Sequence, residues 1–208
     1  MLGHYLNHWD GGEYGRELVD GDVHGLTADR LDCTRQQAKT FAYATLYGAS
    51  PRGKSANKMA TDMGKPVKWV GRMLTRFAES VPGLQELTAA LNAACRPHPK
   101  NRSLSCIRAL DGYPLVVRSK HAVINTLLQS AGALCAKKWA VEVDAMLPHG
   151  VYIMAHVHDE MQISCPESLV DEVARVVEDA TDAVTAHFGL HVPLASECVV
   201  GRSWQETH

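Results

Sequence analysis

The sequence predicts an α+β fold in which helices come first and a small antiparallel sheet follows. Helix capping and helical spacing dominate the first part of the chain, whereas a period-two alternation typical of strands starts only at Val151. Between them, Asp111-Gly112-Tyr113 is a turn signal followed by the strand-like residues 115–117. With 208 residues, 46% of them hydrophobic, the chain can bury a core in one domain or in two tightly coupled lobes.

Helices are expected through the first hundred residues. Residues 2–20 form a helix interrupted near Asp10-Gly11-Gly12. The next helix begins at Thr34, because Thr34-Arg35-Gln36-Gln37 fits a capping box, and it ends at Gly48. Further along lie a basic, helix-compatible segment, a short helix and an exposed basic loop containing two prolines, predicted at 54–79, 84–94 and 96–108.

The second part of the chain predicts one long helix, a hairpin and a final helix. The long helix covers 121–143. Alternation over 151–165, interrupted by His158-Asp159-Glu160, predicts a hairpin with a polar tip. A helix is expected over 168–188 and a last strand over 192–200.

Charge is partitioned along the chain, although the net charge is only -2. Residues 35–76 hold nine Lys and Arg against one acid, while acids predominate from Glu142 onward. A polyanion would prefer the first segment and a metal cation the second, unless both are simply solvated surfaces. No apolar run of membrane-spanning length, no signal peptide and no Cys-x-x-Cys pair occurs, which favours a cytosolic protein without zinc or disulfides.

Arg35, Lys39, Tyr43 and Tyr47 recur at every fourth position and therefore share one stripe of a helix. Two cations near a helix N-terminus make an anion site, and two tyrosines further along offer flat faces and hydroxyls. Such a stripe could hold a triphosphate at one end and a sugar or base at the other. It is equally the pattern of an amphipathic helix with snorkelling cations and core tyrosines.

The tip His158-Asp159-Glu160 places adjacent carboxylates at the rim of a sheet, which suits Mg²⁺. Two metal ions could there activate an attacking oxygen and stabilise a leaving one. An exposed polar turn without a ligand is the alternative, and a metal-dependent hydrolase is another. His121, Asn125 and Gln129 also lie four apart, and their side chains could read base edges, bond a sugar or face solvent.

Together these segments resemble the family A (polymerase I-like) DNA polymerases, in particular the replicative enzymes of short-tailed, T-seven-type phages. The segment from Arg35 through Lys39, Tyr43 and Tyr47 to Gly48 is similar to the fingers motif Arg-x3-Lys-x3-Tyr/Phe-x3-Tyr-Gly of that family. Val157-His158-Asp159-Glu160 is similar to its palm motif. Gly21-Asp-Val-His24, Leu110-Asp-Gly and the residues 121–134 match in the same order.

The resemblance implies a role for each matching residue. Arg35 and Lys39 would bind the incoming dNTP with His24 nearby, Tyr43 would lie against the deoxyribose, and Tyr47 against the template-side stack. A tyrosine at position 43 implies tolerance of dideoxynucleotides. Asp159 would ligate one of two Mg²⁺ ions, with Glu160 beside it. Lys39, His158 and Glu160 would also take part in catalysis. Primer–template DNA would be contacted by Arg118, Asn125, Gln129, His158 and His208.

On this resemblance the chain is an incomplete right-hand polymerase: helices leading from palm to fingers (1–33), fingers (34–108) and C-terminal palm (109–208). The Asp-x-Ser-x-x-x-Leu-Arg motif that carries the other metal-binding aspartate does not occur in it. We therefore expect either half of a split polymerase or a fragment of a longer chain, needing an upstream polypeptide with the thumb, the exonuclease and that aspartate. It would act in the bacterial host cytoplasm, without a membrane. A non-catalytic remnant that only binds DNA or nucleotide is the alternative.

Overall fold

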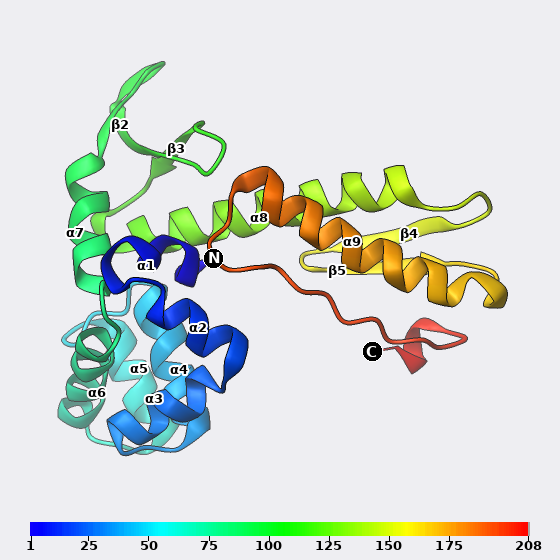
Figure 1. Cartoon of the computed structure of the whole chain (residues 1–208). Helices are drawn as coiled ribbons and strands as arrows, with labels where there is room; N and C mark the ends of the chain where they lie inside the picture. Colours follow the sequence, from blue (N-terminus) through cyan, green and yellow to red (C-terminus); the bar gives the residue numbers. More distant parts are fainter. Residues whose placement is uncertain (208) are drawn as a thin grey trace. The chain divides into compact units, whose positions relative to one another are not determined.

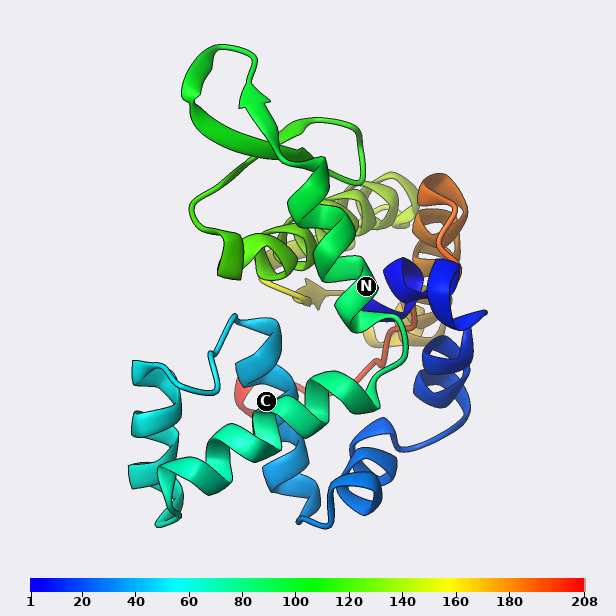
Figure 2. The same ribbon diagram turned by 90° about the vertical axis from the view of Figure 1, so that its left-hand side faces the viewer.

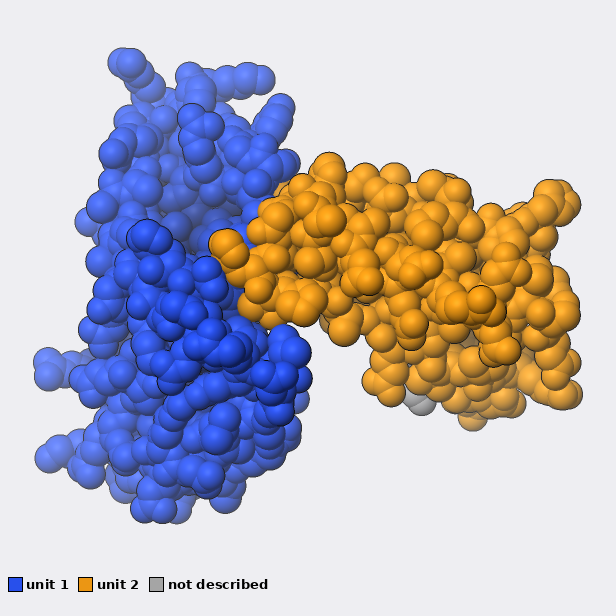
Figure 3. All heavy atoms as spheres, viewed as in Figure 1, with its two compact units in different colours: residues 1–130 blue, residues 131–208 orange. Residues whose placement is uncertain are grey.

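The computed structural model describes residues 1–207 and divides the chain into two compact units, residues 1–130 and 131–208 (Figure 3). The α+β prediction is confirmed, because helices form most of the first unit and a two-stranded sheet accompanies helices in the second. Within residues 1–207, no helix combines the length and the apolar character that crossing a membrane requires.

Three short helices open the first unit: α1 (Leu2–Asp10), α2 (Glu13–Asp20) and α3 (Val23–Leu31) (Figure 1). The predicted break after Asp10 is confirmed, since Gly11 and Gly12 adopt positive φ angles of 59° and 82°. The Asp10 carboxylate accepts hydrogen bonds from the backbone N–H groups of Gly12 and Tyr14 at 2.8 and 2.9 Å and so caps α2. Helix α3 has no counterpart among the helical segments that the sequence pattern predicted.

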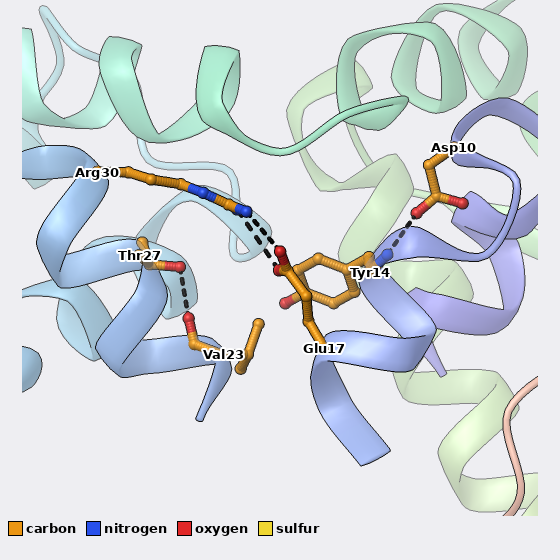
Figure 4. A network of polar contacts seen from close by, with 6 residues as sticks. All are labelled: Asp10, Tyr14, Glu17, Val23, Thr27 and Arg30. Carbon is orange, nitrogen blue, oxygen red and sulfur yellow. Dashed lines mark hydrogen bonds and ion pairs between the residues drawn. The ribbon is translucent and has the colours of Figure 1, made fainter. Parts of the chain in front are cut away.

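An ion pair joins α2 to α3. The Glu17 carboxylate of α2 accepts hydrogen bonds from Nη1 and Nη2 of Arg30 in α3 (Figure 4). Within α3, the hydroxyl of the buried Thr27 donates to the Val23 carbonyl at 2.6 Å. The Tyr14 ring lies beside Glu17 in the same view. These contacts fix the segment that precedes the candidate nucleotide-binding helix.

Four helices follow: α4 (Arg35–Leu46), α5 (Lys54–Met63), α6 (Val67–Ser80) and α7 (Leu84–Ala94). The helix-compatible segment 54–79 contains two helices, because Gly64 takes a positive φ of 61° and Pro66 caps the start of the next helix. Phe41 of α4 and Phe77 of α6 are almost fully buried in the core of this unit. That core fixes one side of α4 and leaves its other side exposed.

Residues 96–108 form strands, so the predicted basic loop is wrong. Strands β1 (Arg96–His98), β2 (Asn101–Arg108) and β3 (Pro114–Val117) make an antiparallel sheet in the order β1-β2-β3, which continues from the end of α7 (Figure 2). Pro97 misled the prediction, because proline is tolerated on an edge strand and β1 is one. Ile107 and Val117 anchor the sheet in the core.

The long helix α8 (Val123–Met146) begins two residues later than predicted, after the 3-10 turn η1 (Lys120–Ala122). His121 therefore lies in η1 and does not share the α-helical stripe of Asn125 and Gln129. The boundary between the compact units falls inside α8, after Ser130. The division of the chain into 1–33, 34–108 and 109–208 stays a prediction about function.

In the second unit, β4 (Tyr152–Val157) and β5 (Glu160–Ser164) form the predicted antiparallel hairpin. The 3-10 turn η2 (Glu167–Leu169) leads into α9 (Val170–Phe188). The apolar side of α9 packs in one cluster with residues of the hairpin. Val143, Val151 and Val177 form the core with Trp139, whose indole N–H donates to the Val177 carbonyl at 3.2 Å. Residues 192–200, all of which the structure describes, form no strand, so that prediction is wrong; the last element is the 3-10 turn η3 (Trp204–Glu206).

Candidate nucleotide-binding helix and acidic hairpin

Helix α4 begins with the predicted capping box. The Thr34 hydroxyl accepts the Gln37 backbone N–H at 3.2 Å, and the Gln37 side chain accepts the Thr34 backbone N–H at 3.1 Å. Ala38, Phe41 and Ala42 form the buried face. Because of this arrangement, Arg35, Tyr43 and Tyr47 are exposed and Lys39 is half-buried, as the stripe requires.

Tyr43 is the centre of a small cluster on this stripe. Its ring is 49% exposed, the Lys39 Nζ atom lies 5.9 Å from the ring centroid, and the His24 ring centroid is 6.2 Å away. Lys39 lies one turn after Arg35, close to the N-terminus of α4, where cations favour an anion such as phosphate. The rings of His24 and Tyr43 offer flat faces beside these cations, and a phosphorylated sugar could bind such a group of side chains. The structure thus brings together His24, Lys39 and Tyr43 from two helices.

Arg35 has a partner that the sequence pattern did not predict. Its Nε and Nη2 atoms donate to the two carboxylate oxygens of Asp22 at 2.7 and 3.0 Å, in the two-pronged geometry that guanidinium also uses on phosphate. The Arg35 hydrogen bond lowers the pKa of Asp22 to about 2, helped by backbone N–H groups that include that of Gly25. A Cβ on residue 25 would stand 2.7 Å from Asp22 Oδ2, so the glycine makes room for this carboxylate.

The surroundings of His24 favour its neutral form. Partial burial lowers its pKa from the ordinary value of 6.5, and the nearby cations Arg35 and Lys39 lower it further. A neutral imidazole can both donate and accept a hydrogen bond, whereas the protonated ring can only donate. An arriving polyphosphate would reverse the local field and favour protonation.

Tyr14 is a second residue near α4 that the sequence pattern did not predict. Burial raises the pKa of Tyr14 to about 12, with smaller contributions from Glu17 and from Tyr43. Tyr14 belongs to the same buried cluster as Phe41 and Ala42 of α4. No sequence spacing relates Tyr14 in α2 to α4, so only the fold could reveal it.

The end of α4 meets the start of the α8 region. Gly48 adopts a φ of 82°, and a Cβ there would lie 2.4 Å from the His121 carbonyl oxygen, so only glycine permits this approach. Gln129 donates its Nε2–H to the Tyr47 hydroxyl at 3.0 Å. Two residues predicted to contact the template side and the primer–template are therefore in direct contact. Asn125 is half-buried on α8, and Arg118 is exposed after β3.

The acidic hairpin lies in the second unit. His158 and Asp159 form its two-residue turn between the paired Val157 and Glu160, and His158 has an unusual positive φ of 58°. Asp159 is exposed, while the Glu160 Oε1 atom accepts a hydrogen bond from Gln162 Nε2 at 2.5 Å. The neighbouring carboxylates thus differ, because Gln162 restrains Glu160 and Asp159 faces solvent.

In the part of the chain that the structure describes, no group of three or more His, Cys, Asp or Glu side chains is arranged around a metal position. Magnesium needs only one or two protein carboxylates when substrate phosphates and water complete its shell, so Asp159 fits the ion as a single ligand. His208 lies outside the described residues, and the prediction for it stays a prediction.

Comparison with known proteins shows which family the chain belongs to. The family described as DNA polymerase family A matches residues 17–206. The chain is 32% identical to the DNA-directed DNA polymerase of Enterobacteria phage T3 and 31% identical to that of Escherichia phage T7, covering 100% of this chain and 31% of each relative. The chain belongs to DNA polymerase family A.

The fold agrees with this assignment. The POL domain of Pol1 from M. smegmatis, in complex with DNA primer-template and dNTP, superposes with a TM-score of 0.71 at 18% identity, covering 99% of this chain and 38% of that one. At that identity the likeness shows the fold alone. The chain spans about a third of the length of the phage polymerases that it matches.

Proposed function

We propose that these 208 residues provide the nucleotide-binding helix and one metal-binding carboxylate of a DNA polymerase that adds dNTPs to a primer 3′-OH. The observation that carries the proposal is the cluster of His24, Arg35, Lys39 and Tyr43 on and beside α4. Family membership and the fold support it.

The cations of α4 would hold the triphosphate. Arg35 presents its guanidinium to Asp22 in the same geometry that it would offer to a phosphate, so the carboxylate stands in for the nucleotide. Lys39, one turn further, adds a point charge that neutralises the phosphates as charge moves onto the leaving group. Tyr43 would then lie against the deoxyribose, and Tyr47 against the template-side stack.

Asp159 would hold Mg²⁺ through its exposed carboxylate, and Glu160 lies beside it in the chain. When bound, a pair of such ions activates the attacking 3′-oxygen and stabilises the leaving one. We propose that the second carboxylate comes from sequence outside residues 1–208, in the Asp-x-Ser-x-x-x-Leu-Arg motif of the family. The thumb and any exonuclease would come from the same polypeptide.

Duplex DNA would be contacted by the polar residues that follow β3. Gln129, placed by its hydrogen bond to Tyr47, together with Asn125 and Arg118, would touch the minor groove, where the acceptors are similar for all base pairs. These contacts would test base-pair geometry without selecting a sequence. His158 would lie near the primer end.

A nucleotide-binding measurement tests the proposal. Lys39→Gln should weaken binding of a dNTP with Mg²⁺ by about 10- to 100-fold, the range expected when a charge-assisted hydrogen bond is lost. Lys58→Gln, which removes an exposed lysine of α5, is the matched control and should bind like wild type. Isothermal titration calorimetry on both variants decides the matter, and equal affinities for the two would remove α4 as the triphosphate site.

A further inference from the structure

We propose that the sheet β1-β2-β3 and its hairpin tip bind the phosphate backbone of nucleic acid, on a surface separate from the α4 cluster. The proposal rests on the proposed function in supposing that the chain works on DNA. It adds a second place where the chain grips that DNA.

The charge of this surface is the first observation. Six exposed cations lie on the strands or next to them, at Arg96, Lys100, Arg102, Arg108, Arg118 and Lys120. Residues 96–120 contain one acid, Asp111, whose carboxylate accepts the Tyr113 backbone N–H at 3.0 Å in the turn between β2 and β3. Within residues 1–207, none of the six cations takes part in an ion pair with an acidic side chain.

The strand register shows which residues lie on each face of the sheet. Ile107 and Val117 point into the core, and Leu115, paired with Ile107, packs against it from the same face. Arg96 pairs with the buried Cys106, and alternation along β2 places Arg108 on that same side, opposite to Ile107. One face of the sheet therefore packs on the core through Ile107 and Val117, and the other carries exposed arginines on either side of Cys106, while Lys100 and Arg102 lie toward the tip.

The dimensions suit a polyphosphate. Arg102 and Arg108 lie six residues apart in β2, which corresponds to about 20 Å of extended strand. Duplex DNA carries one negative charge per about 1.7 Å of axis, so several phosphates fall within that span. An isolated carboxylate would use only one of these cations.

Side chains between the cations favour nucleic acid over an acidic polypeptide. Tyr113 at the β2–β3 turn is 73% exposed, and Leu104 and Val116 are exposed on the strands. Aromatic rings and guanidinium planes stack on bases, which an acidic peptide does not offer. Single strands and duplexes share the phosphate chemistry, and the measurement below separates them.

The test is the salt dependence of DNA binding by the 208-residue chain. The triple variant Lys100→Gln/Arg102→Gln/Arg108→Gln removes three exposed cations of this surface and none of the α4 cluster. Its matched control, Lys137→Gln/Arg175→Gln/Arg202→Gln, removes three exposed cations from residues 131–208. Fluorescence anisotropy with a blunt duplex, with a single strand and with a primer–template then gives the affinity at several salt concentrations.

We expect the slope of log K against log salt to fall by about 2.7 on a duplex, or by about 2 on a single strand, in the triple variant only. The DNA form that shows the change identifies the source of the phosphates. Equal slopes for the triple variant and its control overturn the proposal. The proposal also fails if the triple variant no longer binds poly-glutamate but keeps the wild-type salt dependence of DNA binding, because the surface then binds an acidic polypeptide. Failure of the proposed function shows separately, as absence of dNTP binding by the wild-type chain.

Discussion

At the scale of single residues, the pair between Asp22 and Arg35 has a functional consequence. A nucleotide that binds Arg35 must displace Asp22, because both use the same guanidinium atoms. Asp22→Asn keeps a residue that can cap α3 but removes the competing charge. We expect it to bind inorganic triphosphate more tightly, by no more than about fivefold since the pair is exposed, in the same calorimetric assay. Weaker binding by this variant would mean that Asp22 positions Arg35 instead of competing for it.

The same pair sets a pH dependence. The folded-state pKa of Asp22 is lowered to about 2 from its ordinary value of 3.8, so the pair is fully formed above pH 4 and is lost as the pH falls through 2. The carboxyl carbon of Asp22, followed by NMR, should titrate near 2 in the wild type. In Arg35→Gln the midpoint should move up toward 3.8. A midpoint unchanged by that substitution would show that the backbone donors alone depress the pKa.

The residue scale also shows how far sequence reasoning reached. The spacing of Arg35, Lys39, Tyr43 and Tyr47 along one helix was enough to place them on one stripe, whereas the exposure of the two tyrosines is a finding of the structure. Asp22 and Tyr14 come from other segments, and their packing against α4 cannot be predicted from periodicity. Contacts between elements are the part of the site that a pattern cannot provide.

At the scale of elements, α4 depends on its capping box. Thr34→Ala removes the acceptor for the Gln37 backbone N–H and should lower the free energy of unfolding by about 1 kcal/mol. Thr61→Ala in α5 is the matched control, because its hydroxyl donates only to the Asn57 carbonyl within its own helix, and it should change stability by less than about 0.5 kcal/mol. Urea denaturation followed by circular dichroism compares the two. Equal losses would argue that the box does not stabilise α4.

Element prediction failed in two informative places. Residues 96–108 were expected to be a loop because of Pro97 and Pro99, yet an edge strand tolerates proline and the apolar Ile107 anchors β2 in the core. Residues 192–200 have the composition of a strand, and the structure pairs them with no neighbour, leaving Val199 and Val200 exposed. A segment with strand propensity forms a strand only where a partner strand or a packed face is present.

At the scale of the whole molecule, the two compact units each hold one part of the proposed chemistry: the cations of α4 in residues 1–130 and Asp159 in residues 131–208. Phosphoryl transfer requires both to act on one nucleotide, together with a second carboxylate. The proposed polymerase activity therefore requires residues of both units together, and a test on either unit alone would not reveal it.

Primer extension tests this central claim most directly. The chain is mixed with the polypeptide that carries the Asp-x-Ser-x-x-x-Leu-Arg motif, a labelled primer–template, dNTPs and Mg²⁺, and is assayed beside Asp159→Ala and its control Asp179→Ala, an exposed acid of α9. We predict extension by the wild type and by Asp179→Ala in the mixture, and none by Asp159→Ala or by the chain alone. Normal extension by Asp159→Ala, or extension by the chain alone, would contradict the account of a shared metal site.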